Sequence, residues 1–297
     1  MRGSYSGNTL AFQAKARSSI LLPRSKVMKI IDSFIFFNEF DLLEGRLEYL
    51  YNHVDYFILV ESNMTFSGKK KPFYFRDNMH RYQKYLDKII YHPFIVKNVE
   101  QYDFSQQVTN MDIKSAPWQI EHLHRQELIN IAETFNDDDL LIISDADEIP
   151  SIGAITAAKA VLTTAPYHVI AFNQDMFFYN FKTKLVDGWP GSVAALNKIA
   201  RQQGGEWMRM MRYSMPRLTN GGWHLSYWLD PEKIAVKIES FSHQELNTDY
   251  MKNPDRILDR VSNGTDIYDR VIPITQNDLT TIDPVIYSIF ERHQVGV

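Results

Sequence analysis

Short apolar runs of strand length alternate with segments of helical spacing through the first half of the chain. The apolar runs cover 29–37, 54–62, 89–96 and 140–144. Helical spacing is expected at 41–51, 81–89, 118–135 and 151–164. This alternation is typical of βαβ units, whose strands form a sheet with helices packed on it. The sequence therefore predicts an α/β fold with a mostly parallel central sheet flanked by helices.

Two of these helices have a recognisable start. Asp41 followed three residues later by Glu44 is a capping-box pattern, in which two side chains satisfy the free amides of the first turn. Ser151 stands directly before an apolar helical segment and is expected to be its N-cap.

The N-terminal segment 1–27 differs from the rest because it holds lysines, arginines and serines but no acidic residue. This composition resembles a transit peptide, although an N-terminal extension without fixed structure is the preferred interpretation. Met28 precedes the first apolar run, and no repeat or linker divides the remainder. Residues 28–297 are therefore expected to form a single domain.

Composition excludes several classes of function. A formal net charge of −4 provides no basic field for nucleic acid. The chain has no cysteine, which rules out disulfides, thiolate metal sites and a cysteine nucleophile, and fits a cytoplasmic location. No apolar run approaches the roughly 20 residues that a membrane-spanning helix needs.

The segment 140–151, LLIISDADEIPS, places three carboxylates directly after a buried strand. Ligands of open α/β sheets bind beyond the carboxyl ends of the strands, so Asp145, Asp147 and Glu148 are expected at that edge. In extended geometry Asp145 and Asp147 would point to one side and could hold one Mg²⁺ or Mn²⁺ ion, which often shares its ligands with substrate phosphates.

Other interpretations of this segment remain open, both for the carboxylates and for the class of protein, including a magnesium-dependent phosphatase. Asp147 and Glu148 could simply favour the N-terminus of the next helix. Haloacid-dehalogenase-like phosphatases use the first Asp of such a motif as nucleophile, here Asp145, but usually on their first strand. Nucleotide-sugar glycosyltransferases of the GT-A fold carry the motif in mid-chain, as here. A non-catalytic glycan-binding protein is a further alternative.

Three segments, in this order and spacing, resemble glycosyltransferase family 17. They are FNEFDLLEGRLEYLYNHVDYFILVESNMTFSGKKKPFYF, DDLLIISDADEIPS and GGWHLSYWLDPEKIAVKIESFSHQE. The similarity runs from about residue 29 to about residue 247 and therefore covers most of the chain. The resemblance implies a GT-A-like fold, a UDP-sugar donor such as UDP-GlcNAc, a divalent metal (Mn or Mg), a glycan acceptor and inversion at the anomeric carbon.

The resemblance also implies roles for individual residues. Asp145 and Asp147 match the metal and donor motif, and Glu148 completes it. Further donor-binding residues are expected in the first matching block and at the end of the second strand: Asn38, Glu39, Glu44, Arg46 and Glu61.

Later segments add candidates of their own. His224 could be a third metal ligand, or it could be hydrogen-bonded among aromatic side chains, and its neighbour Trp223 is a candidate donor contact. Arg125 could bind the donor diphosphate, or it could only pair with Glu121 one helical turn earlier. The base that deprotonates the acceptor hydroxyl is expected to be Glu245 or Glu232.

Overall fold

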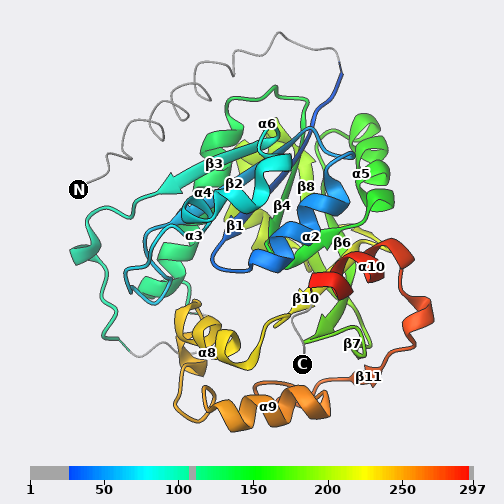
Figure 1. Ribbon diagram of the computed structural model, residues 1–297. Helices are drawn as coiled ribbons and strands as arrows, with labels where there is room; N and C mark the ends of the chain where they lie inside the picture. Colours follow the sequence, from blue (N-terminus) through cyan, green and yellow to red (C-terminus); the bar gives the residue numbers. More distant parts are fainter. Residues whose placement is uncertain (1–26, 107–111, 294–297) are drawn as a thin grey trace.

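A computed structural model describes residues 27–106 and 112–293 of the chain. A central sheet runs through the molecule and carries helices on both faces (Figure 1), so the predicted α/β architecture is present. The extension expected at 1–27 lies outside the described residues, except for residue 27. Within the described ranges, no helix is long and apolar enough to cross a membrane.

Four parallel strands form one half of the sheet, in the order β3-β2-β1-β4. They are β1 (Ile30–Phe36), β2 (Tyr56–Ser62), β3 (Ile89–Phe94) and β4 (Leu140–Asp145). The inner strands are mostly apolar because helices cover both of their faces, and Asp32 and Ser33 of β1 are buried polar exceptions. Their carboxyl ends share one edge, so the residues that follow β1, β2 and β4 meet there.

The other half of the sheet is antiparallel, so the sheet is mixed rather than mostly parallel. β8 (Trp189–Leu196) runs antiparallel to β4, and β6 (Val169–Phe178) runs antiparallel to β8. β7 (Thr183–Leu185) and β11 (Ile274–Gln276) extend this half, again antiparallel. A strand buried on both faces is a similar apolar run in either direction, and its periodicity therefore does not reveal its orientation.

Three short strands bring the C-terminal third of the chain to the end of β4. β5 (Glu148–Pro150) follows β4 and pairs antiparallel with β10 (Gly222–Ser226). β10 also pairs parallel with β6 at 175–178, and β9 (Arg217–Leu218) pairs parallel with β6 at 171–172. The segment around His224 thus lies beside the acidic segment at 145–148.

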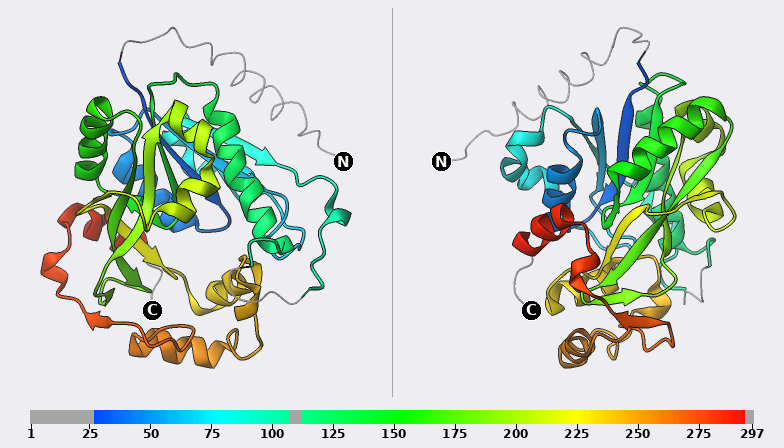
Figure 2. Two further views of the ribbon diagram at one scale, coloured as in Figure 1. Left: turned by 180° about the vertical axis from the view of Figure 1, so that it is seen from behind. Right: turned by 90° about the vertical axis from the view of Figure 1, so that its right-hand side faces the viewer.

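Helices cover the two faces of the sheet and its carboxyl edge. α2 (Phe40–Leu50) and α10 (Pro284–His293) pack together on one face, whereas α4, α6 and α7 lie on the other (Figures 1 and 2). The remaining helices are α3 (Tyr74–Asp77), α4 (Ala116–Ala132), α5 (Ile152–Thr164), α6 (Asn197–Gln203), α7 (Gly205–Met211), α8 (Pro231–Ser240) and α9 (Pro254–Asn263). Short 3-10 turns are η1 (Met79–Tyr85), η2 (Val99–Gln101), η3 (Gln244–Leu246) and η4 (Leu279–Thr281).

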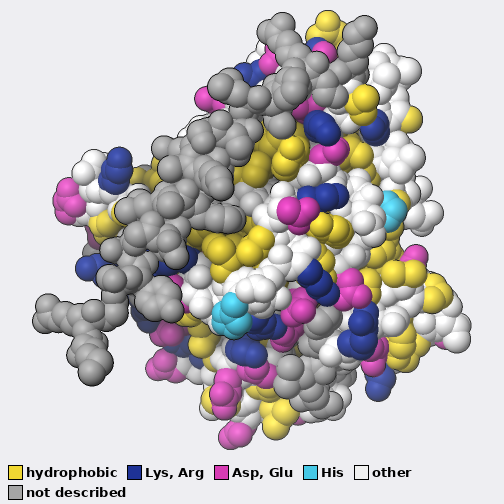
Figure 3. Space-filling view, turned by 45° about the horizontal axis from the view of Figure 1, so that its top comes forward, with side chains coloured by type: hydrophobic (Ala, Val, Ile, Leu, Met, Phe, Trp, Pro, Cys, Tyr) yellow, Lys and Arg dark blue, Asp and Glu magenta, His cyan; other side chains and the backbone are white. Residues whose placement is uncertain are grey.

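The main hydrophobic core lies between the sheet and its helices, and a smaller cluster lies under the carboxyl edge. This second cluster joins α8 and α9 through Ile234, Ile238, Ile257 and Val261. It fixes α8 across the edge at which β1 and β4 end (Figure 1). On the face drawn in Figure 3, acidic and basic side chains are interspersed among those shown in colour.

One of the two predicted helix starts is confirmed. Ser151 caps α5 by accepting a hydrogen bond from the amide of Ala154 at 3.0 Å. The capping box is wrong, because α2 begins at Phe40 and its N-cap is Glu39. Asp41 and Glu44 instead lie 3.0 and 3.3 Å from one guanidinium nitrogen of Arg81, which binds both carboxylates.

Candidate active site

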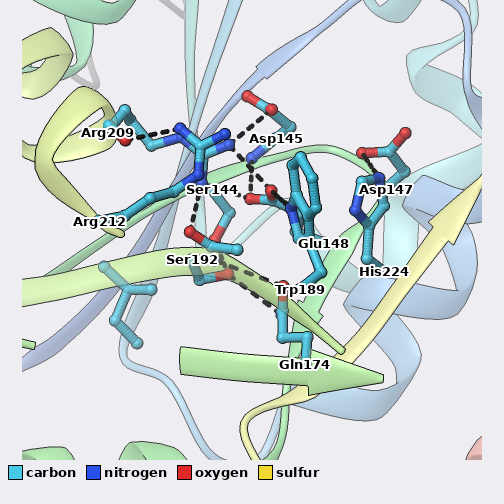
Figure 4. A network of polar contacts seen from close by, with 12 residues as sticks. Ser144, Asp145, Asp147, Glu148, Gln174, Trp189, Ser192, Arg209, Arg212 and His224 are labelled. Atoms are coloured by element: carbon cyan, nitrogen blue, oxygen red, sulfur yellow. Dashed lines mark hydrogen bonds and ion pairs between the residues drawn. The ribbon is translucent and has the colours of Figure 1, made fainter. Parts of the chain in front are cut away.

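The acidic segment 145–148 forms a turn between two strands at the carboxyl edge of the sheet. Asp145 ends β4, Ala146 and Asp147 make the turn, and Glu148 begins β5. The chain is therefore not extended from Asp145 to Asp147, as the sequence had led us to expect. Figure 4 shows the two carboxylates on different sides of the turn, where each meets its own basic partners.

Two arginines contact the carboxylate of Asp145. Arg209 of α7 places Nη2 2.7 Å from one oxygen, and Arg125 of α4 places Nη2 3.2 Å from the other. Burial would raise the pKa of Asp145, but the charges of Arg209 and Arg125 outweigh that effect and hold the pKa below its usual value. Asp145 is therefore anionic and held in a fixed position.

Of the two contacts that the sequence left open for Arg125, the ion pair with Glu121 is present, and contact with a donor diphosphate stays a prediction. Arg125 pairs with Glu121 on the same buried face of α4, and it reaches Asp145 as well. Its other nitrogen lies 2.6 Å from Glu206 of α7. Burial opposes the ionisation of Glu206, yet the charge of Arg125 and hydrogen bonds from His122 and Arg125 lower its pKa to about 2. Arg125 thus joins α4 and α7 to the acidic turn.

Asp147 meets a lysine and a histidine. Nζ of Lys237 on α8 lies 2.7 Å from Oδ2, and Nε2 of His224 on β10 lies 3.6 Å from Oδ1. Burial raises the pKa of Asp147, but the charges of Lys237 and His224 lower it by more, and the pKa falls well below its usual range. The same ion pair raises the pKa of Lys237 despite its burial.

Glu148 is fully buried and holds the framework of the site together. Its two oxygens accept hydrogen bonds from both terminal nitrogens of Arg209, at 2.6 and 2.9 Å. They also accept from the indole of Trp189 at 3.1 Å and from the amide of Asp145 at 3.0 Å. These four bonds leave the carboxylate no free surface, so in this structure Glu148 positions Arg209 and the turn.

The paired glycines before His224 allow backbone to approach backbone. Gly222 has φ of +117°, and a Cβ there would lie 2.1 Å from the carbonyl oxygen of Ile149. This close approach sets β10 against β5 and places His224 opposite Glu148 in the register. Trp223 points the other way and packs edge-to-face on Tyr49 at 5.6 Å, with only 9% of its surface exposed.

The segment after β1 contributes Asn38 and Glu39 to this edge. Glu39 accepts hydrogen bonds from the amides of Phe37 and Asn38, both at 3.1 Å, and lies 3.9 Å from Nζ of Lys237. Oδ1 of Asn38 is buried and has no hydrogen-bond partner in the described part of the chain. Glu44, which the sequence also suggested for donor binding, is paired with Arg81 on α2's outer side.

Two further donor candidates are buried in the protein interior. Arg46 is fully buried and forms an ion pair with Asp32, 2.6 Å apart. Glu61 is also fully buried, and it accepts hydrogen bonds from the amide of Phe75 and the hydroxyl of Tyr91. Burial raises the pKa of Glu61. In this structure both side chains are occupied by protein partners.

The two candidate bases lie at opposite ends of the segment that contains α8. Glu232 is exposed in the first turn of α8. Glu245 lies in η3, with Oε1 2.7 Å from Nδ1 of His243 and Oε2 buried without a partner among the described residues. The ring of His243 packs on that of Trp118 in the first turn of α4, at 4.8 Å.

Sequence reasoning missed the basic residues that surround the turn. Arg209 and Lys237 contact Asp145 and Asp147 from helices that lie 64 and 90 positions away along the chain. Lys237 falls within the segment that resembles family 17, and this was the only signal that pointed to it. Nothing in the local sequence around Arg209 distinguishes it from a surface arginine.

Asp147 and His224 fit a shared divalent cation in part. Their facing atoms are 3.6 Å apart, and an imidazole nitrogen and a carboxylate oxygen are both ligands that such a cation accepts. Mg²⁺ and Mn²⁺ commonly take only one or two carboxylates and complete their shell with water and substrate phosphates. Across 27–106 and 112–293, however, no three His, Asp or Glu residues gather as a metal site, and Lys237 takes the other oxygen of Asp147.

The model of Glycosyltransferase family 17 matches residues 7–279. Because this range covers most of the chain, the protein belongs to glycosyltransferase family 17. The α/β class predicted from the sequence is confirmed by the structure, and the family assignment favours a transferase over the phosphatase alternative.

Curated relatives carry the name β-1,4-mannosyl-glycoprotein 4-β-N-acetylglucosaminyltransferase. The human protein is 26% identical over 249 residues and the rat protein 26% over 251, in each case 74% of this chain and 44% of the relative. The chain thus spans less than half the length of these relatives. A solved structure of GalNAc-T7 with UDP, GalNAc and Mn²⁺ aligns with 91% of this chain and 55% of that chain, at 7% identity and a TM-score of 0.42.

Proposed function

We propose that the protein is a metal-dependent, inverting glycosyltransferase that moves GlcNAc from UDP-GlcNAc to a glycan acceptor. The observation that carries this proposal is the position of Asp147, between His224 and Lys237 at the carboxyl edge of the parallel strands. Ligands of α/β sheets bind at this edge. Similarity to enzymes named as N-acetylglucosaminyltransferases supports GlcNAc as the sugar.

Asp147 and His224 would hold the cation, while Asp145 lies on the other side of the turn with Arg209 and Arg125. When bound, a Mn²⁺ or Mg²⁺ ion supplies positive charge to the leaving diphosphate. The surrounding residues keep both aspartates ionised, since Lys237 lowers the pKa of Asp147 and Arg209 lowers that of Asp145. A donor diphosphate would therefore meet a site whose charges are already oriented.

The nucleotide end of the donor is assigned to the segment after β1. Asn38 offers a buried oxygen that accepts no hydrogen bond from the described residues, which suits an N–H or O–H group of the donor. Glu39 holds the backbone of this segment through two amide hydrogen bonds. Direct donor contacts by Glu44, Arg46, Glu61 and Trp223 stay predictions.

Glu245 is the base that we assign to the acceptor hydroxyl. Its Oε2 is buried and unpartnered, and His243 fixes the other oxygen. Trp118, which packs on His243, lies seven residues from Arg125 on α4, or about 10 Å along the helix. The proton of the hydroxyl passes to Glu245, the hydroxyl oxygen bonds to the anomeric carbon, and the bond to UDP breaks with its electron pair on the diphosphate.

Calorimetry of UDP-GlcNAc binding, with and without Mn²⁺, tests the donor site. We expect binding to depend on Mn²⁺ in the wild type and to be lost in Asp147→Asn. Asp175→Asn is the matched control, because Asp175 is an exposed aspartate on β6 that pairs with Lys184. Absence of nucleotide binding by the wild type under both conditions would contradict the proposed function.

A further inference from the structure

Arg212 is a partly buried arginine beside the acidic turn, and it forms no ion pair with a carboxylate in the part of the chain that the structure describes. It follows directly after α7, and its Nη1 donates to the carbonyl oxygen of Arg209 at 2.6 Å. Nη2 lies 3.5 Å from the hydroxyl of Tyr213, and Nε is buried without a hydrogen-bond partner. No acidic oxygen of the described residues lies within 4.0 Å of its guanidinium nitrogens.

The other cations of the site are already neutralised. Arg209 binds Glu148 and Asp145, Arg125 binds Asp145 among its three carboxylates, and Lys237 binds Asp147. Arg212 lies near the same carboxylates, but among the described residues it forms an ion pair with none of them. Burial and the charge of Arg209 lower the pKa of Arg212 by more than the charges of Glu148 and Asp145 raise it, so an anion in direct contact would stabilise the charged guanidinium.

Two aromatic rings hold the guanidinium in place. Its central carbon lies 5.3 Å from the ring centre of Trp189 and 4.8 Å from that of Tyr213. Trp189 also contacts the ring of His224 at 5.3 Å, so one indole separates Arg212 from the proposed cation site. Figure 4 shows Arg209 and Arg212 on one side of the turn, and Asp147 with His224 on the other.

We infer that Arg212 binds the diphosphate of the donor from the side opposite His224 and neutralises it as UDP leaves. A guanidinium suits this task because its planar fork donates two hydrogen bonds to phosphate oxygens. The aromatic rings restrict its orientation before the ligand arrives, which reduces the entropy lost on binding. This inference rests on the proposed function, because the anion is taken to be the leaving diphosphate.

Calorimetry with inorganic pyrophosphate, UDP and uridine in the presence of Mg²⁺ tests the inference. In Arg212→Gln we expect the dissociation constants of pyrophosphate and UDP to rise about tenfold or more, as for a lost charged hydrogen bond. Uridine has no phosphate, so its binding should not change. The matched control is Arg217→Gln, since Arg217 is an exposed arginine that donates to the carbonyl of Tyr213.

Thermal unfolding of each variant checks that it is folded, and Arg212→Lys is the substitute if the glutamine variant is not. Arg212→Lys keeps the charge but lacks the planar fork of the guanidinium, so we expect a smaller loss of pyrophosphate affinity than in Arg212→Gln. Equal binding of pyrophosphate and UDP by wild type and the Arg212 variants would overturn the inference while leaving the proposed function intact. Binding of pyrophosphate through Arg212, but not of UDP-GlcNAc, would overturn the proposed function alone. Binding of no phosphate ligand by the wild type would overturn both.

Discussion

Arg46 binds both oxygens of Asp32, at 2.7 and 2.6 Å, in a fully buried pair beneath the acidic turn. The remaining guanidinium nitrogen donates to the carbonyl oxygens of Asp145, Ala146 and Glu148, at 3.2, 3.4 and 2.6 Å. α2 and β1 thus hold the turn through its backbone, while its aspartate side chains contact Arg209 and Lys237. A residue suggested for donor binding therefore supports the site from within.

Replacement of Arg46 by methionine should destabilise the fold, because Asp32 would remain buried without its partner. Removing one member of such a pair costs about 3–5 kcal/mol, which urea unfolding would measure. The double variant Arg46→Met, Asp32→Asn removes the unpaired charge and should recover part of the loss. A loss below about 1 kcal/mol in the single variant would mean that the pair contributes little.

His124 should make stability depend on pH. It lies between the rings of Phe66 and Phe94, and burial, with smaller effects from nearby cations, lowers its pKa to about 3. Its pKa is about 6.5 in an unfolded chain. Below pH 6.5 the unfolded state therefore binds the extra proton, and stability falls as the pH drops from about 6.5 towards 3.

Urea unfolding of wild type and His124→Gln at several pH values between 7 and 4 measures this effect. Below pH 6, we expect the free energy of unfolding of the wild type to fall by up to about 1.4 kcal/mol per pH unit more than that of the variant. His168→Gln is the control, since His168 is exposed. Parallel curves for wild type and His124→Gln would show that this histidine is not kept neutral by the fold.

The sequence predicted those parts of the site that depend on residues close to one another along the chain. An apolar run followed by acids located β4 and the acidic segment after it, and the local hydrogen bond of Ser151 defined the start of α5. It did not predict the partners of Asp145 and Asp147, because Arg209 and Lys237 reach them only through tertiary packing. The turn itself was missed because alternating side chains were assumed to continue past the end of the strand.

Lys237 should compete with a divalent cation for Asp147. Its Nζ lies 2.7 Å from Oδ2 of Asp147, so its positive charge already occupies one side of the carboxylate that would hold the cation. In Lys237→Met we expect Mn²⁺ to bind several-fold more tightly, as measured by electron paramagnetic resonance of the free ion. Addition of Mn²⁺ should also raise the Tm of this variant more than that of the wild type, since the ion replaces the lost positive charge.

Lys233→Met is the control for this prediction, because Lys233 lies on the same helix and pairs with Asp230 at the surface. Unchanged Mn²⁺ affinity in Lys237→Met would mean that the ion does not bind at Asp147.

Glu245 and Glu232 can be separated by their effects on turnover. Glu245→Gln keeps the size of the side chain but removes the proton acceptor, so turnover should fall about 10²- to 10⁴-fold. Donor affinity should stay unchanged, because Glu245 lies outside the acidic turn. Glu232→Gln should leave turnover close to that of the wild type, since this side chain is exposed at the start of α8.

Release of UDP from UDP-GlcNAc, with a panel of glycosides or water as acceptor, measures turnover for both variants. Calorimetry of UDP-GlcNAc provides the donor affinity. His243→Gln gives a second check, because His243 orients Glu245 through a 2.7 Å contact and should affect turnover less than removal of the carboxylate itself. A large loss in Glu232→Gln with normal turnover in Glu245→Gln would move the base to the first turn of α8.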